Sequence, residues 1–246
     1  MDNEIKFYNE ILISFGKILV LLQLIPISVG ILKWRYLNKP LKIFWYFCTT
    51  YFIIDLFVQI LIWFVSNYYS YVKSIVVSLH IKDFSFTGIL YFLNNFSLLG
   101  YFYFLVLKKT KLSPIIKWIS IILWIVSLIN YLFIEGYTVV GIFNPTADAI
   151  YCFVLPCIFM WYLYNENGKV PLSKNPYFWI NLRFLIPNLI SLVFKLFGNK
   201  IQNTDSLLFV KIGILQNGIW LVGLIFACIG FYYARYTKYL SKPTTL

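Results

Sequence analysis

The chain has 246 residues, of which 61% are hydrophobic, 21% aromatic and only 12% charged, and its formal net charge is +12. A soluble domain usually carries about 25% charged residues, so this chain cannot cover a water-facing surface with polar groups. The composition therefore excludes an ordinary soluble domain and favours a protein surrounded by lipid. The positive charge does not indicate a nucleic-acid partner, because the basic residues fall in short loops between apolar runs.

Seven apolar stretches are each long enough to cross a bilayer, which takes about 20 residues of helix. They are apolar on every face, whereas the strands of a membrane β-barrel alternate polar and apolar residues. We therefore predict an all-α, polytopic integral membrane protein, in which residues 1–246 form one domain, a seven-helix transmembrane bundle. The predicted spans are approximately 10–34, 43–66, 86–107, 115–134, 147–164, 178–197 and 207–233.

The distribution of Lys and Arg predicts the orientation, because cytoplasmic loops carry an excess of these residues. Thirteen of the 21 lie in the first, third and fifth loops and the C-terminal tail, and four lie in segments on the opposite side. The N-terminus is therefore expected outside and the C-terminus in the cytoplasm.

The longest outer loop, residues 67–85, contains the apolar segment SIVVSLHI, which is too short to span a bilayer. Two interpretations stay open for it. The segment lies along the membrane surface, or it extends the third helix.

Asp55 lies inside the second predicted span, in the stretch YFIIDLFVQI. An Asp at the centre of a spanning helix costs about 2.5–3.5 kcal/mol on insertion scales, so a residue of this kind is a candidate for function. Tyr51, Asp55 and Gln59 follow one another at intervals of four and share one helix face. Lys17 lies at a similar depth in the first span. Asp55 therefore either forms a structural ion pair with Lys17 or serves a ligand, an ion or a proton.

Other spans add polar residues at comparable depth. The sixth span has a polar stripe around Pro187, where a kink would free backbone carbonyls, and the last span begins with Lys211. We predict an outward-facing, net-basic pocket for a small anionic, zwitterionic or lipid-like ligand. Its predicted ligand-binding residues are Lys17, Asp55, Gln59, Asn188, Lys211 and Asn217.

A structural interpretation of the same residues stays open. Amides commonly hold transmembrane helices together, and a lysine near a helix end can extend to the membrane surface. We expect Arg183, which lies on a different face of the sixth span from Asn181, to extend to the cytoplasmic surface in this way.

No catalytic or cofactor-binding pattern is visible. The chain has one histidine, His80, and no GxSxG motif or P-loop, and its four cysteines form no CxxC pair. We therefore predict no catalytic residue, no cofactor and no metal site. An internal repeat of the kind found in many transporters is also missing.

Four segments carry a resemblance that covers most of the chain: IFWYFCTTYFIIDLFVQI, LYFLNNFSLLGYFYF, NPYFWINLRFLIPNLISLVF and VKIGILQNGIWLVG. They resemble poorly characterised seven-helix membrane proteins and modules of Bacteroidota-type bacteria, some of which occur beside sensor histidine kinases. This chain has Asn95 where those proteins usually have an acidic residue, and Lys211 where they often have histidine. The resemblance implies a bacterial cytoplasmic (inner) membrane and a sensory or accessory role.

We therefore expect a non-enzymatic, receptor-like sensor or partner-binding protein, which contacts membrane lipids and signals through a membrane or cytoplasmic partner. Two alternatives stay open. One is a membrane lipid hydrolase that resembles the lysoplasmalogenases, with Asp55 as acid or base. The other is a proton- or solute-coupled transporter that uses Asp55.

Overall fold

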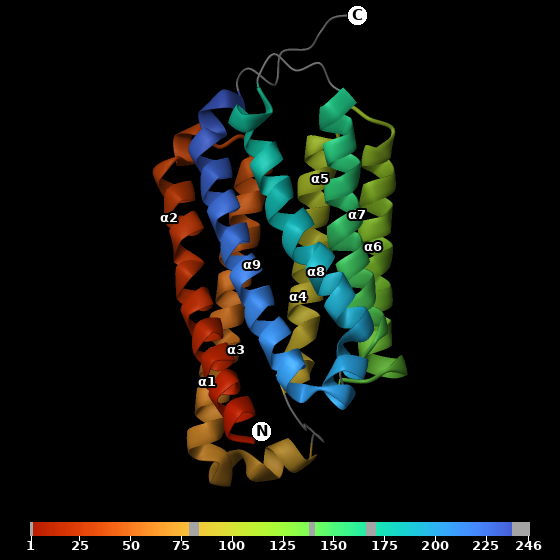
Figure 1. Cartoon of the computed structure of the whole chain (residues 1–246). Coiled ribbons are helices and arrows are strands. Elements are labelled where there is room, and N and C mark those ends of the chain that lie inside the picture. The colour runs from red at the N-terminus through yellow and green to blue at the C-terminus, as the bar shows by residue number, and fades with distance from the viewer. Residues whose placement is uncertain (1, 79–83, 138–140, 166–170, 238–246) are drawn as a thin grey trace, which may run out of the picture. The chain divides into compact units, whose positions relative to one another are not determined.

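The computed structural model describes residues 2–78, 84–137, 141–165 and 171–237, and all regular elements in these ranges are helical (Figure 1). The chain divides into two compact units, which are described separately. The first unit comprises Met1–Trp45 and Ala149–Leu246, and the second comprises Tyr46–Asp148.

The first unit is organised around its last helix. Helices α1, α2 and α8 all pack against α9, and α8 makes the most extensive contact with it. The helices of this unit are α1 (Asp2–Leu22), α2 (Leu24–Leu32), the start of α3 (Lys39–Ser78), most of α7 (Phe143–Asn165), α8 (Pro176–Thr204) and α9 (Ser206–Tyr232).

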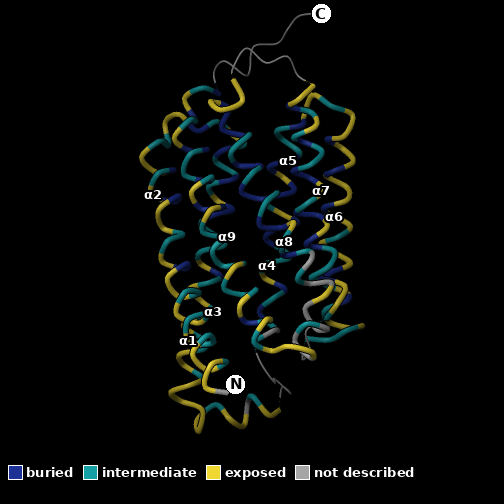
Figure 2. The backbone as a smooth tube through the Cα atoms, viewed as in Figure 1, coloured by how far each residue is buried: buried dark blue, intermediate teal, exposed yellow. Residues whose placement is uncertain are grey.

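The second unit contains the rest of α3, the short helices α4 (Gly88–Asn94) and α5 (Gly100–Val106), and α6 (Leu112–Ile129). A π-helical turn, Asn95–Leu99, joins α4 to α5, and a second π-helical turn, Asn130–Ile134, extends α6. α4, α5 and the first π turn pack against α6. Much of α6 is exposed, as Figure 2 shows, and its exposed face is apolar.

The prediction of an all-helical protein is confirmed, and each of the seven predicted stretches lies in helix. The first stretch is interrupted at Gln23, between α1 and α2. Proline explains this break: Pro26 has no N–H to donate to the carbonyl of Leu22, which is the last residue of α1.

The described part of the segment after the second predicted span, residues 67–78, belongs to α3. α3 continues to Ser78, past a residue with non-helical backbone angles at Tyr68 (φ −120°, ψ 26°). The last part of α3 turns away from the axis of its first part (Figure 1). Residues 79–83 lie outside the described part of the chain, and Phe84–Thr87 forms a 3-10 turn before α4.

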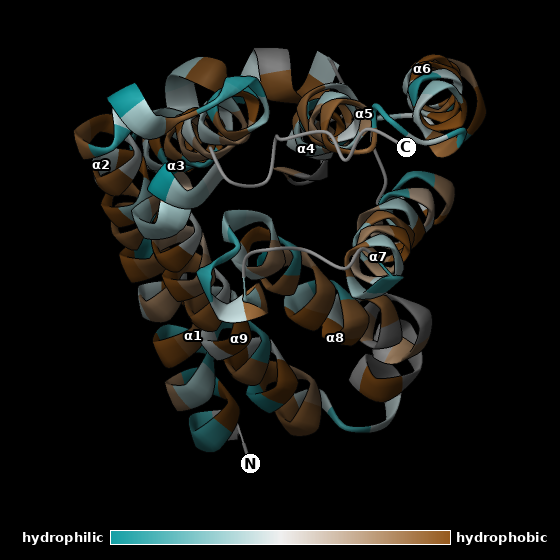
Figure 3. Ribbon diagram, turned by 90° about the horizontal axis from the view of Figure 1, so that it is seen from above, coloured by the Kyte–Doolittle hydropathy of each residue, from teal (hydrophilic) through white to brown (hydrophobic). Residues whose placement is uncertain are grey.

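Six helical segments are long and apolar enough to cross a membrane, which supports the prediction of an integral membrane protein. Figure 3 shows how apolar the ribbons of α1, α2 and α6 are. α8, which contains the predicted sixth span, is not among the six. The segments are Asn3–Leu32, Lys39–Ser74, Gly88–Val106, Leu112–Ile134, Phe143–Asn165 and Ser206–Tyr236.

Two glycines allow close packing in the first unit. Trp45 donates a hydrogen bond from Nε1 to the carbonyl of Ile27 at 2.9 Å, and its indole fills the space beside Gly30. On α9, a Cβ at Gly230 would lie 2.8 Å from Cγ1 of Ile180 and 3.2 Å from the carbonyl oxygen of Pro176. Both positions therefore need a residue without a side chain.

The Gly30→Ala variant is expected to unfold at a lower temperature than the wild-type protein in detergent. Alanine adds about 1 kcal/mol of helix propensity, but displacing a packed indole costs about 1–3 kcal/mol. Gly16→Ala is the control, because a Cβ at Gly16 meets nothing within 4 Å. Equal stabilisation of both variants would contradict the packing described for Trp45.

Candidate functional site

Asp55 is bound by a tyrosine of the same unit. The hydroxyl of Tyr91, on α4, donates a hydrogen bond to Oδ1 of Asp55 at 2.5 Å. The ring of Tyr51 lies 5.1 Å from the ring of Tyr91, centroid to centroid. The predicted common face of Tyr51 and Asp55 is thus confirmed, since both contact Tyr91. Gln59, four residues farther along α3, is half-buried.

Two adjacent asparagines end α4 and begin the first π turn. Asn95 donates a hydrogen bond from Nδ2 to Oδ1 of Asp148 at 2.7 Å, and each of these residues is only 7% exposed. Asn94 is 6% exposed, and within the described residues neither its Oδ1 nor its Nδ2 has a hydrogen-bond partner. Asn94 is therefore a buried amide whose donors and acceptor are unpaired among the described residues.

These five residues form what we call the α4 polar centre: Asp55, Tyr91, Asn94, Asn95 and Asp148. Tyr91 and Asn95 are four residues apart and share one face of the helix. Carboxylates from α3 and α7 are therefore bound by one residue of α4 and by the first residue of the π turn that follows it. The centre includes a π turn, a feature that occurs frequently at functional sites. An unsatisfied buried amide costs about 1–3 kcal/mol, which a ligand with both donor and acceptor atoms would recover.

Lys17 and Lys211, the two lysines predicted to bind a ligand, lie at different positions along the axis of α1. Lys211 forms an ion pair with Glu4 (Nζ to Oε1, 3.6 Å), and its ammonium lies 4.8 Å from the ring centroid of Tyr8. Lys17 is exposed and follows Tyr8 by nine residues, about 14 Å along the helix axis. The structure therefore does not bring Lys17 and Lys211 together.

Of the two predicted amides of the first unit, Asn188 binds a backbone carbonyl of the protein. Asn188 is buried and donates to the carbonyl of Phe184, one turn earlier in α8, at 2.8 Å. The neighbour of Asn217, Gln216, donates to Oγ of Ser191 at 2.8 Å and so ties α9 to α8. Asn217 itself is half-buried. Asp55 and Gln59 belong to the other unit, so the pocket predicted from all six residues stays a prediction.

Arg183 does not extend to the surface, contrary to the prediction. Its side chain is 4% exposed, and its guanidinium carbon lies 6.0 Å from the ring centroid of Phe44 and 5.7 Å from that of Phe184. The cause is packing: Arg183 lies on the face of α8 that contacts α9, where Gly223 leaves room for its stem. Its Nε and Nη1 have no hydrogen-bond partner in the part of the chain that the structure describes.

The contacts of Arg183 do not offset the cost of burying its charge. Each cation–π contact contributes about 0.5–2 kcal/mol. Removing an ion from water costs several kcal/mol even after relaxation of the surroundings. The described contacts of Arg183 in this unit therefore offset only part of the free-energy cost of burying its charge.

Glu135 caps the start of α7. Its Oε1 accepts hydrogen bonds from the backbone N–H groups of Ile142 (2.9 Å) and Phe143 (3.0 Å), and its Oε2 accepts one from Nδ2 of Asn130 (2.6 Å). Burial alone would raise the pKa of this carboxyl, but the three hydrogen bonds outweigh it and lower the pKa below its usual value. The residue lines a recess of about 280 Å³, and the sequence pattern places it only in a loop between two predicted spans.

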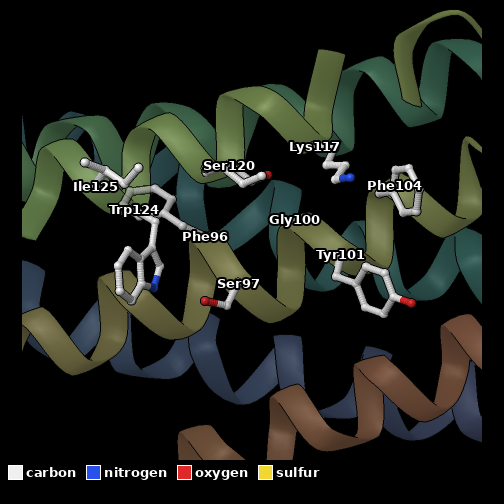
Figure 4. A pocket seen from close by; sticks show the side chains of 10 residues that line it. Phe96, Ser97, Gly100, Tyr101, Phe104, Lys117, Ser120, Trp124 and Ile125 are labelled. Carbon is white, nitrogen blue, oxygen red and sulfur yellow. The ribbon is translucent and has the colours of Figure 1, made fainter. Parts of the chain in front are cut away.

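An apolar groove of about 580 Å³ lies between the α4–α5 segment and α6 (Figure 4). Trp124 and Ile125 line it from α6, whereas Ser97 and Tyr101 line it from the opposite side. Lys117 is the basic residue in this lining, and it lies five residues from the start of α6. The groove therefore combines an apolar body with one cation.

No protein family matches the chain, and neither does any curated protein or any solved structure. Functional inference therefore depends on the chemistry of the residues described above.

Removing either partner of the Tyr91–Asp55 hydrogen bond is expected to destabilise the protein by about 1–3 kcal/mol. Because Tyr91→Phe and Asp55→Leu remove the same bond, the double variant should lose less stability than the sum of the two. Thermal unfolding of the four proteins in one detergent measures this coupling. Tyr71→Phe, at an exposed tyrosine of α3, is the control, and strictly additive losses would contradict the bond.

Stability should depend on pH through Glu135. Its pKa in the folded protein is lower than the value of about 4.3 in an unfolded chain, so its contribution is present above that value and is lost as pH falls through the folded pKa. The difference in melting temperature between wild type and Glu135→Gln should be large at pH 7 and should shrink below about pH 4. Glu10→Gln, at an exposed residue of α1, should show no such trend; a constant difference for Glu135→Gln would contradict the cap.

Proposed function

We propose that the protein is a non-enzymatic, seven-helix integral membrane protein that binds a small polar ligand and acts as a sensor or partner-binding protein. The observation that supports this most directly is the Asn94 amide, buried without a partner among the described residues. It lies next to Asn95, and the carboxylates of Asp55 and Asp148 are attached to the same helix. Polar groups of this kind inside a membrane are expensive and are usually retained for function.

The chemistry of the α4 polar centre narrows the class of ligand. Asn94 needs both a donor and an acceptor, and two carboxylates favour hydroxyl or ammonium groups. Of the anionic, zwitterionic and lipid-like ligands expected from the sequence, a zwitterionic molecule or head group therefore suits this centre best.

Seven spans require that α8 crosses the membrane, and its packing supports this. α8 runs antiparallel to α9, which is one of the six apolar segments. Contacts between them follow the whole length of α9: Phe194 with Phe209 near the connection, Ser191 with Gln216, and Pro176 and Ile180 with Gly230 at the far end. With seven spans, the excess of Lys and Arg on one side puts the N-terminus outside and the C-terminus inside.

Two surface features, the apolar groove and the basic loops, suit a membrane lipid and a signalling partner. The apolar groove beside Lys117 suits the acyl chain of a membrane lipid, with the ammonium close to an anionic head group (Figure 4). A signalling partner would meet the basic loops on the cytoplasmic side. The resemblance to seven-helix proteins found beside sensor histidine kinases supports a sensory role in a bacterial cytoplasmic membrane.

A proton- or solute-coupled transporter is the second candidate. The short hydrogen bond between Tyr91 and Asp55 favours it, because proton relays in transporters use carboxylates held inside the membrane. Sealed proteoliposomes separate the two functions: a transporter moves protons or solute across the bilayer, and a sensor does not.

Asn94→Leu tests the proposed ligand site. Because the amide is unsatisfied in the protein itself, leucine should leave the melting temperature of the ligand-free protein unchanged or raise it. The same substitution should remove the small molecule that copurifies with the wild-type protein in mild detergent, measured by native mass spectrometry. The control is Asn95→Leu, which breaks the bond to Asp148 and should lower the melting temperature.

Two results would contradict the proposed site. One is that Asn94→Leu is as destabilised as Asn95→Leu, because Asn94 would then have a structural partner. The other is that wild-type protein from gently solubilised membranes carries no small molecule that Asn94→Leu lacks.

A further inference from the structure

We infer that Arg183 forms a binding site for a phosphate group within the first unit. This site is separate from the α4 polar centre and does not depend on the function proposed for that centre. The phosphate belongs either to a free anion or to a lipid head group, and the experiment below distinguishes the two sources.

Among the described residues of its own unit, no carboxylate is seen to contact Arg183. Its guanidinium lies beside the rings of Phe44 and Phe184. The carboxylates of this unit whose side chains are described belong to Glu4, Glu10 and Asp205. Asp205 directly precedes α9. Glu4 pairs with Lys211, which follows Asp205 by six residues and therefore lies near the same end of α9. Arg183 packs against Gly223, which is 18 residues from Asp205, about 27 Å along the helix.

The backbone at the same place is also unusual. Pro187 has no N–H to donate to the carbonyl of Arg183, four residues earlier. That carbonyl faces α9, and a Cβ at Gly223 would approach it to 3.4 Å. The α8–α9 contact is thus built closely around Arg183, which explains why the side chain stays buried. A guanidinium with unpartnered N–H groups suits oxyanions, since its fixed donors match phosphate oxygens.

An anion would reach this site from the basic end of the first unit, which we define by Lys33, Lys42, Lys174 and Arg235. Each of these cations lies over an aromatic ring of the same end, at 5.0–5.9 Å from the ring centroid. Arg183 is seven residues from the start of α8, about 10 Å along its axis. Side chains in a helix point toward its N-terminus, so the guanidinium points toward this end. Four cations there attract the same anion that Arg183 would bind.

The test uses the full-length protein in detergent and in lipid vesicles. Inorganic phosphate is titrated at constant ionic strength, with chloride as the replaced anion, and the melting temperature is recorded. In the second arm, the protein is reconstituted in phosphatidylcholine vesicles with or without phosphatidylglycerol. Wild type should be stabilised by about 5 °C at saturating phosphate or by the anionic lipid.

Substitutions assign this effect to one residue. Arg183→Gln should abolish the shift, and Arg183→Lys, which keeps the charge without the planar donors, should reduce it by more than half. The matched control is Arg235→Gln, at an exposed arginine of the basic end, which should retain most of the shift. Stabilisation by phosphate alone identifies a free anion, and stabilisation by phosphatidylglycerol alone identifies a head group.

Three results would overturn the inference. The first is the absence of a shift for wild type in both arms. The second is an equal shift in Arg183→Gln, and the third is that wild type binds no radiolabelled phosphate in detergent and no phosphatidylglycerol in vesicles. If Arg183→Gln does not fold, Arg183→Lys and this direct binding measurement decide the question. Asn94→Leu should leave the phosphate response unchanged, so this inference and the proposed function fail independently.

Discussion

A buried polar group in a lipid-embedded protein must find its hydrogen-bond partner within the protein, because hydrocarbon offers none. This requirement governs how the polar side chains of both units are arranged. Asn181 and Asn188 donate to carbonyls one turn earlier in their own helix. Gln216 binds Ser191 between α8 and α9, and Tyr91 and Asn95 bind carboxylates of α3 and α7. The bonds of Gln216, Tyr91 and Asn95 join different helices, whose apolar surfaces lipid would cover equally well.

Four buried side chains of the described residues depart from this pattern: Asn94, Ser127, Asn144 and Arg183. Asn94 lacks a partner at both amide atoms and Arg183 carries a charge, so these two depart furthest, and they differ in chemistry. In the second unit Asn94 is neutral and lies beside carboxylates, whereas in the first unit Arg183 is a cation between two aromatic rings. Unsatisfied groups cost about 1–3 kcal/mol each, and more when charged. A protein whose total stability is about 5–15 kcal/mol loses a substantial fraction of it in this way. A buried group of this cost calls for an explanation, and the one proposed here for Asn94 and Arg183 is that a ligand supplies the partner.

The sequence predicts the helices well, because an apolar run of about 20 residues has only one way to satisfy its backbone in a membrane. Composition does not reveal where those helices deviate. The break at Tyr68 and the π turn at Asn95 leave the apolar pattern unchanged. Tyr91 resembles the other aromatic residues of its stretch, and its role appears only when Asp55 lies beside it. For Arg183, helical angles separate it from Asn181 but do not show that Gly223 of α9 makes room for it.

The opposite charges of the two centres bear on what the protein binds. The sequence led us to expect one net-basic pocket that combined Lys17, Lys211 and Asp55. In the structure, Lys211 is engaged by Glu4 and Tyr8 at the start of α9, and Asp55 by Tyr91. Among the described residues, Arg183 is a buried cation whose Nε and Nη1 have no hydrogen-bond partner, and Asn94 is a buried amide without one. The proposed anion and the proposed zwitterion would therefore contact different residues on different helices. Substitutions at one centre leave the hydrogen bonds described for the other intact, so their effects on binding can be measured one at a time.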